Sequence, residues 1–156
     1  MASAHLIKLI QNTGVMHEAW YNSICGKNRY SGGPVAHYIE EELEKKCPPH
    51  PLLDTDFYLE KYPDIKKVRV DPVEHYLTHG GREWRLPSAL IDPDRYYEHY
   101  NQQVSENSSQ SIVEDFIRSK DRSKAFSFFD VAYYEAQAGM CGASFNRKLE
   151  HFLMKG

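Results

Sequence analysis

Four tyrosines recur along the chain at an almost constant interval. Tyr21, Tyr58, Tyr96 and Tyr134 stand 37, 38 and 38 residues apart. A second set keeps nearly the same interval, and each member is followed by an aliphatic residue: Tyr38, Tyr76, Phe116 and Phe152. Periods of this size are typical of stacked supersecondary units. The sequence therefore predicts an internal repeat, which constrains the shape of the molecule more than its activity.

The clearest unit, residues 52–89, reads as two short helices. Asp54 is expected to cap the first, because its carboxylate can accept bonds from amides that lack a partner at the helix start. Pro63 should end this helix. Asp71 before a proline predicts the start of the second helix. Gly80-Gly81 is expected to end it as a left-handed C-cap.

The same pattern recurs in the other units. Asp92 and Asp130 stand where Asp54 does, and His17 replaces the aspartate in the first unit. Ser111 and Gly33-Pro34 occupy the second helix start. The fold predicted is an all-α array of four two-helix units of about 38 residues, in a single domain spanning residues 1–156. The units are approximately 15–51, 52–89, 90–127 and 128–156, preceded by an N-terminal helix or extension, 1–14.

Composition limits the function classes. The net charge is −3 with both signs interspersed, which disfavours nucleic-acid binding. No apolar run is long enough to cross a bilayer, and Leu6 to Ile10 suggests a short amphipathic helix. The stretch Gln102 to Ser111 is polar and serine-rich, so it is expected to be the mobile loop of the array.

Three cysteines, Cys25, Cys47 and Cys141, give an odd count without a C-x-x-C pair. This pattern suits reduced, buried thiols better than a disulfide framework. It leads to the expectation of a cytoplasmic protein. Neither Cys25 nor Cys141 lies in a recognisable nucleophile signature.

The run from Leu52 to Ser88 carries several separated motifs in a fixed order: LLDTDFYLEKYPDI, DPVEHYLTHG and EWRLPS. It resembles a tandem repeat of bacterial cell-surface polysaccharide proteins, whose pattern reads FD-x-x-YYL-x-x-YPDV, DP-x-x-HYL-x-HG and EGR-x-P-S. The other three units match at their aromatic and capping positions. One departure is Trp84, where the repeat usually has glycine. The resemblance implies an accessory helical module, commonly attached to glycosyltransferases, and supplies no catalytic residue.

The resulting hypothesis is a non-enzymatic interaction or scaffolding module of surface-polysaccharide synthesis, with a protein partner or self-association. A carbohydrate-binding module is the first alternative, in which unburied aromatics bind successive sugars. A small enzyme using His and Asp is the second, and it requires a pocket where such side chains converge. No cofactor is expected for the favoured hypothesis.

The turn formed by Arg82, Glu83, Trp84 and Arg85 is the candidate interaction surface. Arg and Trp are favoured at interaction hot spots, and an indole can also stack on a sugar ring. The simpler interpretation, which is favoured, is that Arg85 braces the turn by bonding helix C-terminal carbonyls.

Other residues that could bind a metal or take part in catalysis are explained more simply by structural roles. His75 and His79 lie four apart, as zinc ligands on a helix can, but His75 shares its repeat position with His37 and His151. Asp54, Asp92 and Asp130 are explained together as helix caps rather than as catalytic acids. The glycine pairs lack the features of a phosphate-binding loop. No catalytic, cofactor-binding or metal-binding residue is predicted.

Overall fold

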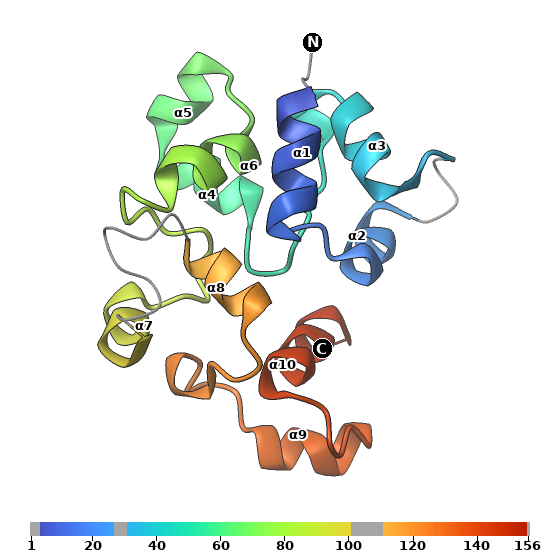
Figure 1. The fold of residues 1–156 in the computed structure, drawn as a ribbon, viewed down its shortest axis with the longest axis vertical. Helices are drawn as coiled ribbons and strands as arrows, with labels where there is room; N and C mark the ends of the chain where they lie inside the picture. The colour runs from blue at the N-terminus through green and yellow to red at the C-terminus, as the bar shows by residue number, and fades with distance from the viewer. Residues whose placement is uncertain (1–3, 27–30, 101–110, 156) are drawn as a thin grey trace.

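The protein is all-α in the part described by the computed structural model, residues 4–26, 31–100 and 111–155 (Figure 1). These residues form ten α-helices and no β-strand, so the all-α class of the predicted fold is confirmed. In chain order the helices are α1 Ala4–Thr13, α2 Glu18–Cys25, α3 Gly33–Glu40, α4 Thr55–Lys61, α5 Pro63–Val68, α6 Pro72–His75, α7 Pro93–Tyr100, α8 Ile112–Arg118, α9 Val131–Ala138 and α10 Phe145–Lys155.

Side-chain caps begin the helices that the sequence predicted to be capped. In each case a side-chain acceptor binds the backbone amide three residues later, which otherwise has no partner. The pairs are His17 with Trp20 (3.1 Å), Asp54 with Phe57 (3.0 Å), Asp92 with Arg95 (3.1 Å) and Asp130 with Tyr133 (3.0 Å). These four predicted caps are confirmed.

The predicted starts of the second helices are also present. Asp71 accepts hydrogen bonds from the amides of Val73 (2.9 Å) and Glu74 (3.1 Å) at the start of α6. Ser111 forms a reciprocal capping box with Glu114 at the start of α8, satisfying two amides at once. The helix α3 begins at Gly33, with proline in its first turn.

Residues 52–89 differ from the prediction in two ways. Pro63 ends α4 as predicted, but it also begins the additional helix α5, because proline fits the first helical position, so the unit has three α-helices rather than two. Gly80 and Gly81 do not adopt the left-handed conformation expected of a C-cap, and Gly81 has φ −63°. The left-handed residue of this turn is Trp84, with φ 60°. The glycines are needed instead because neighbouring side chains approach them closely.

The interior consists of two apolar clusters. The first joins α1 to α6 and contains Tyr21, Tyr38, Tyr58 and Tyr76, all at most 1% exposed. The second joins α7 to α10 and contains Tyr96, Phe116, Phe126 and Leu149. The helix α8 lies between them, with Val113 in the first cluster and Phe116 in the second. Neighbouring Leu53 and Leu52 are likewise divided between the two.

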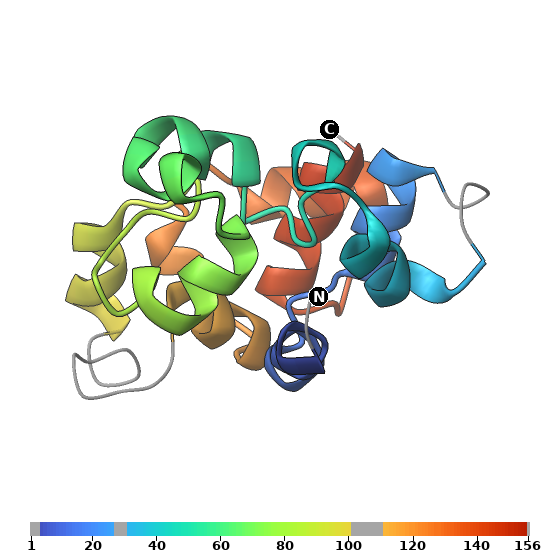
Figure 2. The ribbon, with the colours of Figure 1, turned by 90° about the horizontal axis from the view of Figure 1, so that it is seen from above.

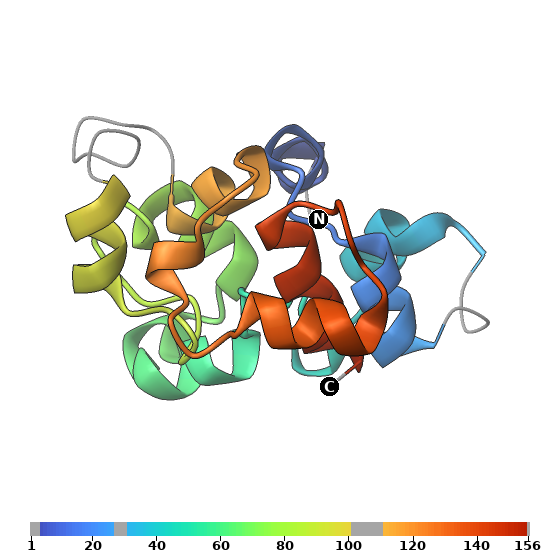
Figure 3. The same cartoon turned by 90° about the horizontal axis from the view of Figure 1, so that it is seen from below.

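The chain brings its last helix, α10, against the start of its second helix, α2. Figure 3 shows α10 beside α2, and the contact is made by side chains 133 residues apart, His17 and Glu150. Seen from above, α7 lies on the opposite side of the molecule from α2 and α3 (Figure 2). The predicted N-terminal helix is α1, which packs on α3 and buries Leu6 and Ile10. Of the predicted mobile loop, residues 102–110 lie outside the described part.

The prediction of reduced, buried thiols is wrong. Cys25, at the end of α2, forms a disulfide with Cys47, and their Cα atoms are 6.2 Å apart. The third thiol, Cys141, is exposed rather than buried. The pairing was hidden because spacing in sequence does not show which cysteines meet in space.

Thiol titration of the native protein checks this pairing. We expect one reactive thiol per chain, Cys141, before reduction, and three after reduction in denaturant. Cys141→Ser should remove the signal of the unreduced protein and leave two thiols after reduction. Three thiols in protein that has never been reduced would contradict the disulfide.

Candidate functional site

The recurring tyrosines are bound to the recurring polar residues of the second helices. Tyr21 bonds His37 (2.8 Å), Tyr58 bonds His75 (2.8 Å) and Tyr134 bonds His151 (2.5 Å), in every case through the histidine Nδ1. The exception is Tyr96, whose hydroxyl donates to Asp115 (2.5 Å). These residues therefore hold the two helices of each predicted unit together.

Asp115 is held in an ion pair as well. Arg122 donates two hydrogen bonds to its carboxylate, at 2.7 and 2.9 Å, and lies over the ring of Tyr100. The hydrogen bond to Asp115 raises the pKa of Arg122. Burial, followed by the carboxylate, raises the pKa of Tyr96. The carboxylate of Asp115 is therefore fully engaged by Tyr96 and Arg122 inside the protein and has a structural role.

The predicted helix-capping carboxylates are at the surface. Asp54, Asp92 and Asp130 are exposed, and each binds a backbone amide as described above. They come from three different helix starts. The structure does not bring them together.

His75 and His79 stack with ring centroids 5.7 Å apart. The Nδ1 atom of His75 is bonded to Tyr58, and that of His79 to the hydroxyl of Thr78 at 2.7 Å. Burial, followed by the charge of Arg85, lowers the pKa of His75. In the described part of the chain, no group of three or more His, Cys, Asp or Glu side chains is placed to hold a metal ion.

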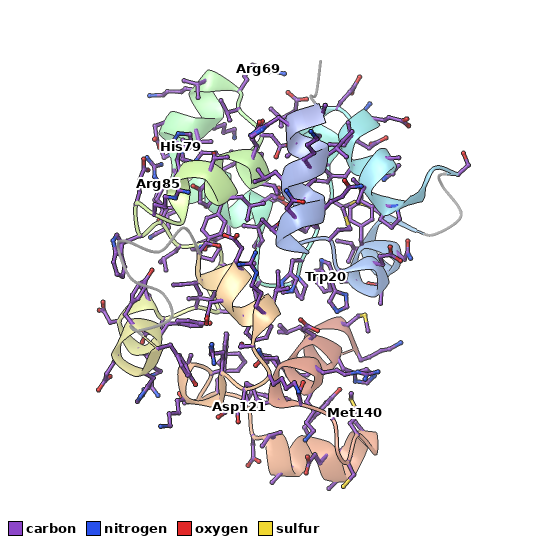
Figure 4. The ribbon with its side chains drawn as sticks, viewed as in Figure 1. Trp20, Arg69, His79, Arg85, Asp121 and Met140 are labelled. Carbon is purple, nitrogen blue, oxygen red and sulfur yellow. A yellow bond between two sulfur atoms is a disulfide. The ribbon has the colours of Figure 1, made fainter. Side chains whose placement is uncertain are left out.

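The candidate turn lies after α6, where Figure 4 shows Arg85 near His79. Arg85 is held by the carboxylates of Glu83 (2.7 Å) and Asp64 (2.9 Å) and lies over the ring of Tyr62. Its backbone amide donates to the carbonyl of Gly80. Arg85 thus braces the turn, with its side chain bound to carboxylates rather than to the helix carbonyls expected from the sequence.

Trp84 is the outward-facing member of this turn. The residue is 41% exposed, and its ring packs against that of Tyr97. Burial raises the pKa of Tyr97 to about 12. Arg82 and Glu83, which precede Trp84 in the chain, are also exposed. The four predicted residues therefore form one surface, in which Arg85 is structural and the indole is accessible.

A second candidate, which the sequence did not predict, is a carboxylate between two histidines. Glu150, on α10, lies 3.2 Å from His17 Nε2 and 3.4 Å from His50 Nε2. Only the contact with His17 has hydrogen-bond geometry. The three residues are brought together only by tertiary folding, so neither motif nor spacing could reveal them.

Backbone amides fix the proton positions of these histidines. The Nδ1 of His17 accepts from Trp20, and the Nδ1 of His50 accepts from Leu52 at 3.1 Å. A neutral imidazole that accepts at Nδ1 must carry its proton on Nε2. Both Nε2 protons therefore face Glu150, and neither Nε2 has a lone pair for a metal. The cluster is built to hold a carboxylate anion.

The cluster borders an open cavity of about 440 Å³. Its polar lining includes His17, Asn146, Arg147, Glu150 and His151. The apolar lining includes Phe116 and two methionines, of which Met140 is labelled in Figure 4. His17, Asn146, Glu150 and His151 are held by hydrogen bonds to the protein itself.

The two histidines keep the carboxyl group of Glu150 ionised. Burial alone would raise its pKa, but the hydrogen bond from His17 and the nearby imidazole of His50 lower it to about 2. The hydrogen bond to Glu150 raises the pKa of His17, whereas burial lowers that of His50. Glu150 is thus an anion at neutral pH and joins the first and last parts of the chain.

Acid unfolding should depend on Glu150. Because its pKa falls from 4.5 to about 2 on folding, its stabilising contribution is complete above pH 4.5 and is lost as the pH falls towards 2. His17 acts oppositely, since its raised pKa gives a contribution that is complete below pH 6.5 and lost as the pH rises. Folding lowers the pKa of His50, so its contribution to stability is complete above pH 6.5 and is lost as the pH falls below that value.

Urea unfolding from pH 2 to pH 8 measures this effect. Glu150→Gln should be less stable than the wild type at pH 6, and the two curves should converge towards pH 2. The matched control is Glu98→Gln on the exposed face of α7, which should follow the wild-type curve. Parallel curves for Glu150→Gln and the wild type would contradict the ion cluster.

Comparison with protein families, with curated proteins and with solved structures found no match. In the part of the chain that the structure covers, no helix is long and apolar enough to cross a membrane.

Proposed function

We propose that this chain is a non-enzymatic array of four helical units that binds other proteins, with the turn Arg82–Arg85 as its recognition surface. Three kinds of contact recur at equivalent positions and support the array. They are the caps of the first helices, the bonds between tyrosine and histidine or aspartate, and the rings of the second helices, which are buried in three of the four units.

The observation that carries the proposal is the conformation of Trp84. A left-handed backbone costs a residue with a side chain about 1 to 2 kcal/mol, and glycine avoids this cost. Trp84 nevertheless keeps φ 60° and is 41% exposed. Strain of this kind is typical of functional positions, and exposed Trp beside Arg is typical of binding hot spots. The tryptophan is therefore best explained by a partner that covers it.

The resemblance of residues 52–88 to a repeat of surface-polysaccharide proteins indicates the process in which the chain takes part. On this basis the partner is an enzyme that builds or modifies bacterial surface glycans. A cytoplasmic location remains a prediction. The disulfide between Cys25 and Cys47 favours an oxidising compartment instead, because disulfides are rare in the cytosol.

Affinity capture tests the protein-binding role. The immobilised whole chain is exposed to an extract of the cells that produce it, and retained proteins are identified by mass spectrometry. We expect retention of a glycan-building or glycan-modifying enzyme, and its loss with Trp84→Gly, which relieves the backbone and removes the indole. Val68→Ala, at an exposed residue of α5, is the control. Retention that survives Trp84→Gly would contradict this surface.

Carbohydrate binding is the second candidate, and it is favoured by the same accessible indole. A sugar ring stacked on Trp84 would change its fluorescence. Because the chain has two tryptophans, Trp84→Gly leaves only Trp20 as a reference. Titration with acidic and neutral polysaccharides should leave the fluorescence unchanged if the partner is a protein. A saturable change that disappears in Trp84→Gly would favour the carbohydrate.

A small enzyme with a His and Asp site has less support. The cavity gathers His17, His151 and Glu150, but each has a hydrogen-bond partner within the protein. The three predicted capping aspartates lie outside this cavity.

A further inference from the structure

One side of the helix α10 lines the open cavity beside Glu150. Glu150, His151 and Met154 follow Arg147 by three, four and seven residues, a spacing that places side chains on one face of a helix. All four residues line the cavity. Its other walls come from α2, from α8 and from the segment between α9 and α10. The cavity therefore forms where parts of the chain that are distant in sequence meet.

Arg147 is not needed as a helix cap. It stands at the repeat position of Asp71 and Ser111, which cap the second helices of their units. The helix α10 begins earlier, at Phe145, and the amide of Arg147 donates to the hydroxyl of Ser144 at 3.3 Å. Among the residues that the structure describes, the exposed guanidinium of Arg147 forms no hydrogen bond and no ion pair. Its charge and its donors are therefore available to a ligand.

The charges around the cavity favour an anion. Glu150 lies three residues from Arg147 on the same helix, where opposite charges can pair. Its oxygens instead face His17 at 3.2 Å and His50 at 3.4 Å, so the negative charge is stabilised within the protein. Among the described residues of the lining, the guanidinium of Arg147 is the one ionised group without a partner. A negatively charged ligand supplies that partner.

The apolar part of the lining indicates the rest of the ligand. Met140, Met154 and Ile117 are half-buried and border the cavity. Methionine is unbranched and polarisable, so it adapts to apolar groups of different shapes. The volume of about 440 Å³ lies within the range of small-molecule sites, about 300 to 1,000 Å³. The lining thus matches a small molecule with an apolar body and one acidic group.

We propose that this cavity binds a small amphipathic organic acid, an aliphatic body that ends in a carboxylate. Arg147 holds the carboxylate, because a guanidinium offers paired donors that match its two oxygens. The hydroxyl of Ser144 belongs to the same lining and can donate a further hydrogen bond. The aliphatic body packs on the two methionines. The turn Arg82–Arg85 does not border this cavity, so the ligand is additional to the protein partner of the proposed function.

Titration of the whole chain with octanoate tests the site, followed through the methyl NMR signals of isotope-labelled methionines. We expect the signals of Met140 and Met154 to shift saturably, with a dissociation constant on the order of 1 mM for so small a ligand. Met16, which packs against the first apolar cluster, should not shift. Octanol has the same body without the charge, and acetate has the charge without the body. Both should bind more weakly than octanoate.

Arg147→Gln should raise the dissociation constant for octanoate at least about tenfold, since a charged hydrogen bond is lost. Arg147→Lys should restore part of the affinity, because it keeps the charge but not the paired donors. Binding of octanol should be the same in all three proteins. The matched control is Arg95→Gln, at an exposed arginine of α7, which should bind octanoate as the wild type does.

Three results would overturn the proposal. They are the absence of any shift at Met140 and Met154, a shift at Met16 as large as theirs, and unchanged binding of octanoate by Arg147→Gln. None of them bears on the capture of a protein partner through Trp84. A failure of the cavity site is therefore distinguishable from a failure of the proposed function.

Discussion

Asp71→Ala is expected to lower the free energy of unfolding by about 3 to 5 kcal/mol, the usual result of breaking a buried ion pair from one side. The carboxylate of Asp71 accepts hydrogen bonds from Tyr38 (2.9 Å) and from the ammonium group of Lys46 (2.8 Å). It also caps α6. Both Lys46 and Asp71 are less than a tenth exposed, so the substitution leaves a positive charge buried without a partner.

Asp54→Ala provides the matched control. Asp54 is also a helix cap, but it is exposed, and its carboxylate accepts a hydrogen bond from the amide of Phe57. Loss of such a cap costs about 1 kcal/mol. Urea unfolding of both variants at neutral pH measures the difference. Equal losses would show that Asp71 acts as a cap alone.

A second substitution separates the charge from the cap. Lys46→Met keeps a long side chain beside Tyr38 and removes the buried ammonium. The double variant Asp71→Ala with Lys46→Met should be more stable than the sum of the two single losses predicts, because residues in contact do not contribute additively. An additive result would contradict the ion pair as the source of the loss.

Helix starts could be predicted from the sequence because capping is local. Asp54 and Asp130 bind amides only three residues away, so a short window contains the whole interaction. The recurring tyrosines were also recognisable, since a ring repeated at a fixed interval indicates a repeated packing environment. Their partners at the second helices lie within 20 residues in the chain.

Contacts between distant segments could not be predicted. The disulfide joins Cys25 to Cys47 across α3, and no local pattern distinguishes this pair from the alternatives with Cys141. The cluster around Glu150 depends on the return of α10 to α2, which is a property of how the helices stack. Trp84 was identified as a departure from the repeat pattern, but its left-handed backbone became visible only in the structure.

Glycine is required at position 80, but for a different reason than the sequence suggested. It was expected to supply a left-handed backbone, but its φ is not in that region. It lies in the π-helical segment Tyr76–Gly80 that follows α6. A Cβ atom at Gly80 would lie 2.1 Å from the Tyr58 hydroxyl and 3.2 Å from Cζ of that ring. Glycine is therefore required so that Tyr58 can reach His75.

Gly80→Ala is accordingly expected to destabilise the protein by about 3 kcal/mol or more, at the upper end of the usual cost of overpacking. Tyr58 is fully buried and cannot move aside without losing its bond to His75. Gly139→Ala is the control, because Gly139 has φ +67° and nothing lies within 4 Å of its added Cβ. That variant should lose only about 1 to 2 kcal/mol, the backbone cost of a left-handed residue.

A double-mutant cycle with Tyr58→Phe identifies the clashing atom. Tyr58→Phe alone should cost about 1 kcal/mol, the value of one hydrogen bond. In that background the nearest atom to the new Cβ is no longer the hydroxyl, so Gly80→Ala should cost markedly less than in the wild type. Because both variants act on the same contact, thermal unfolding should show a favourable coupling between them. If Gly80→Ala cost the same in both backgrounds, the glycine would be required for its backbone freedom and not for the passage of the Tyr58 hydroxyl.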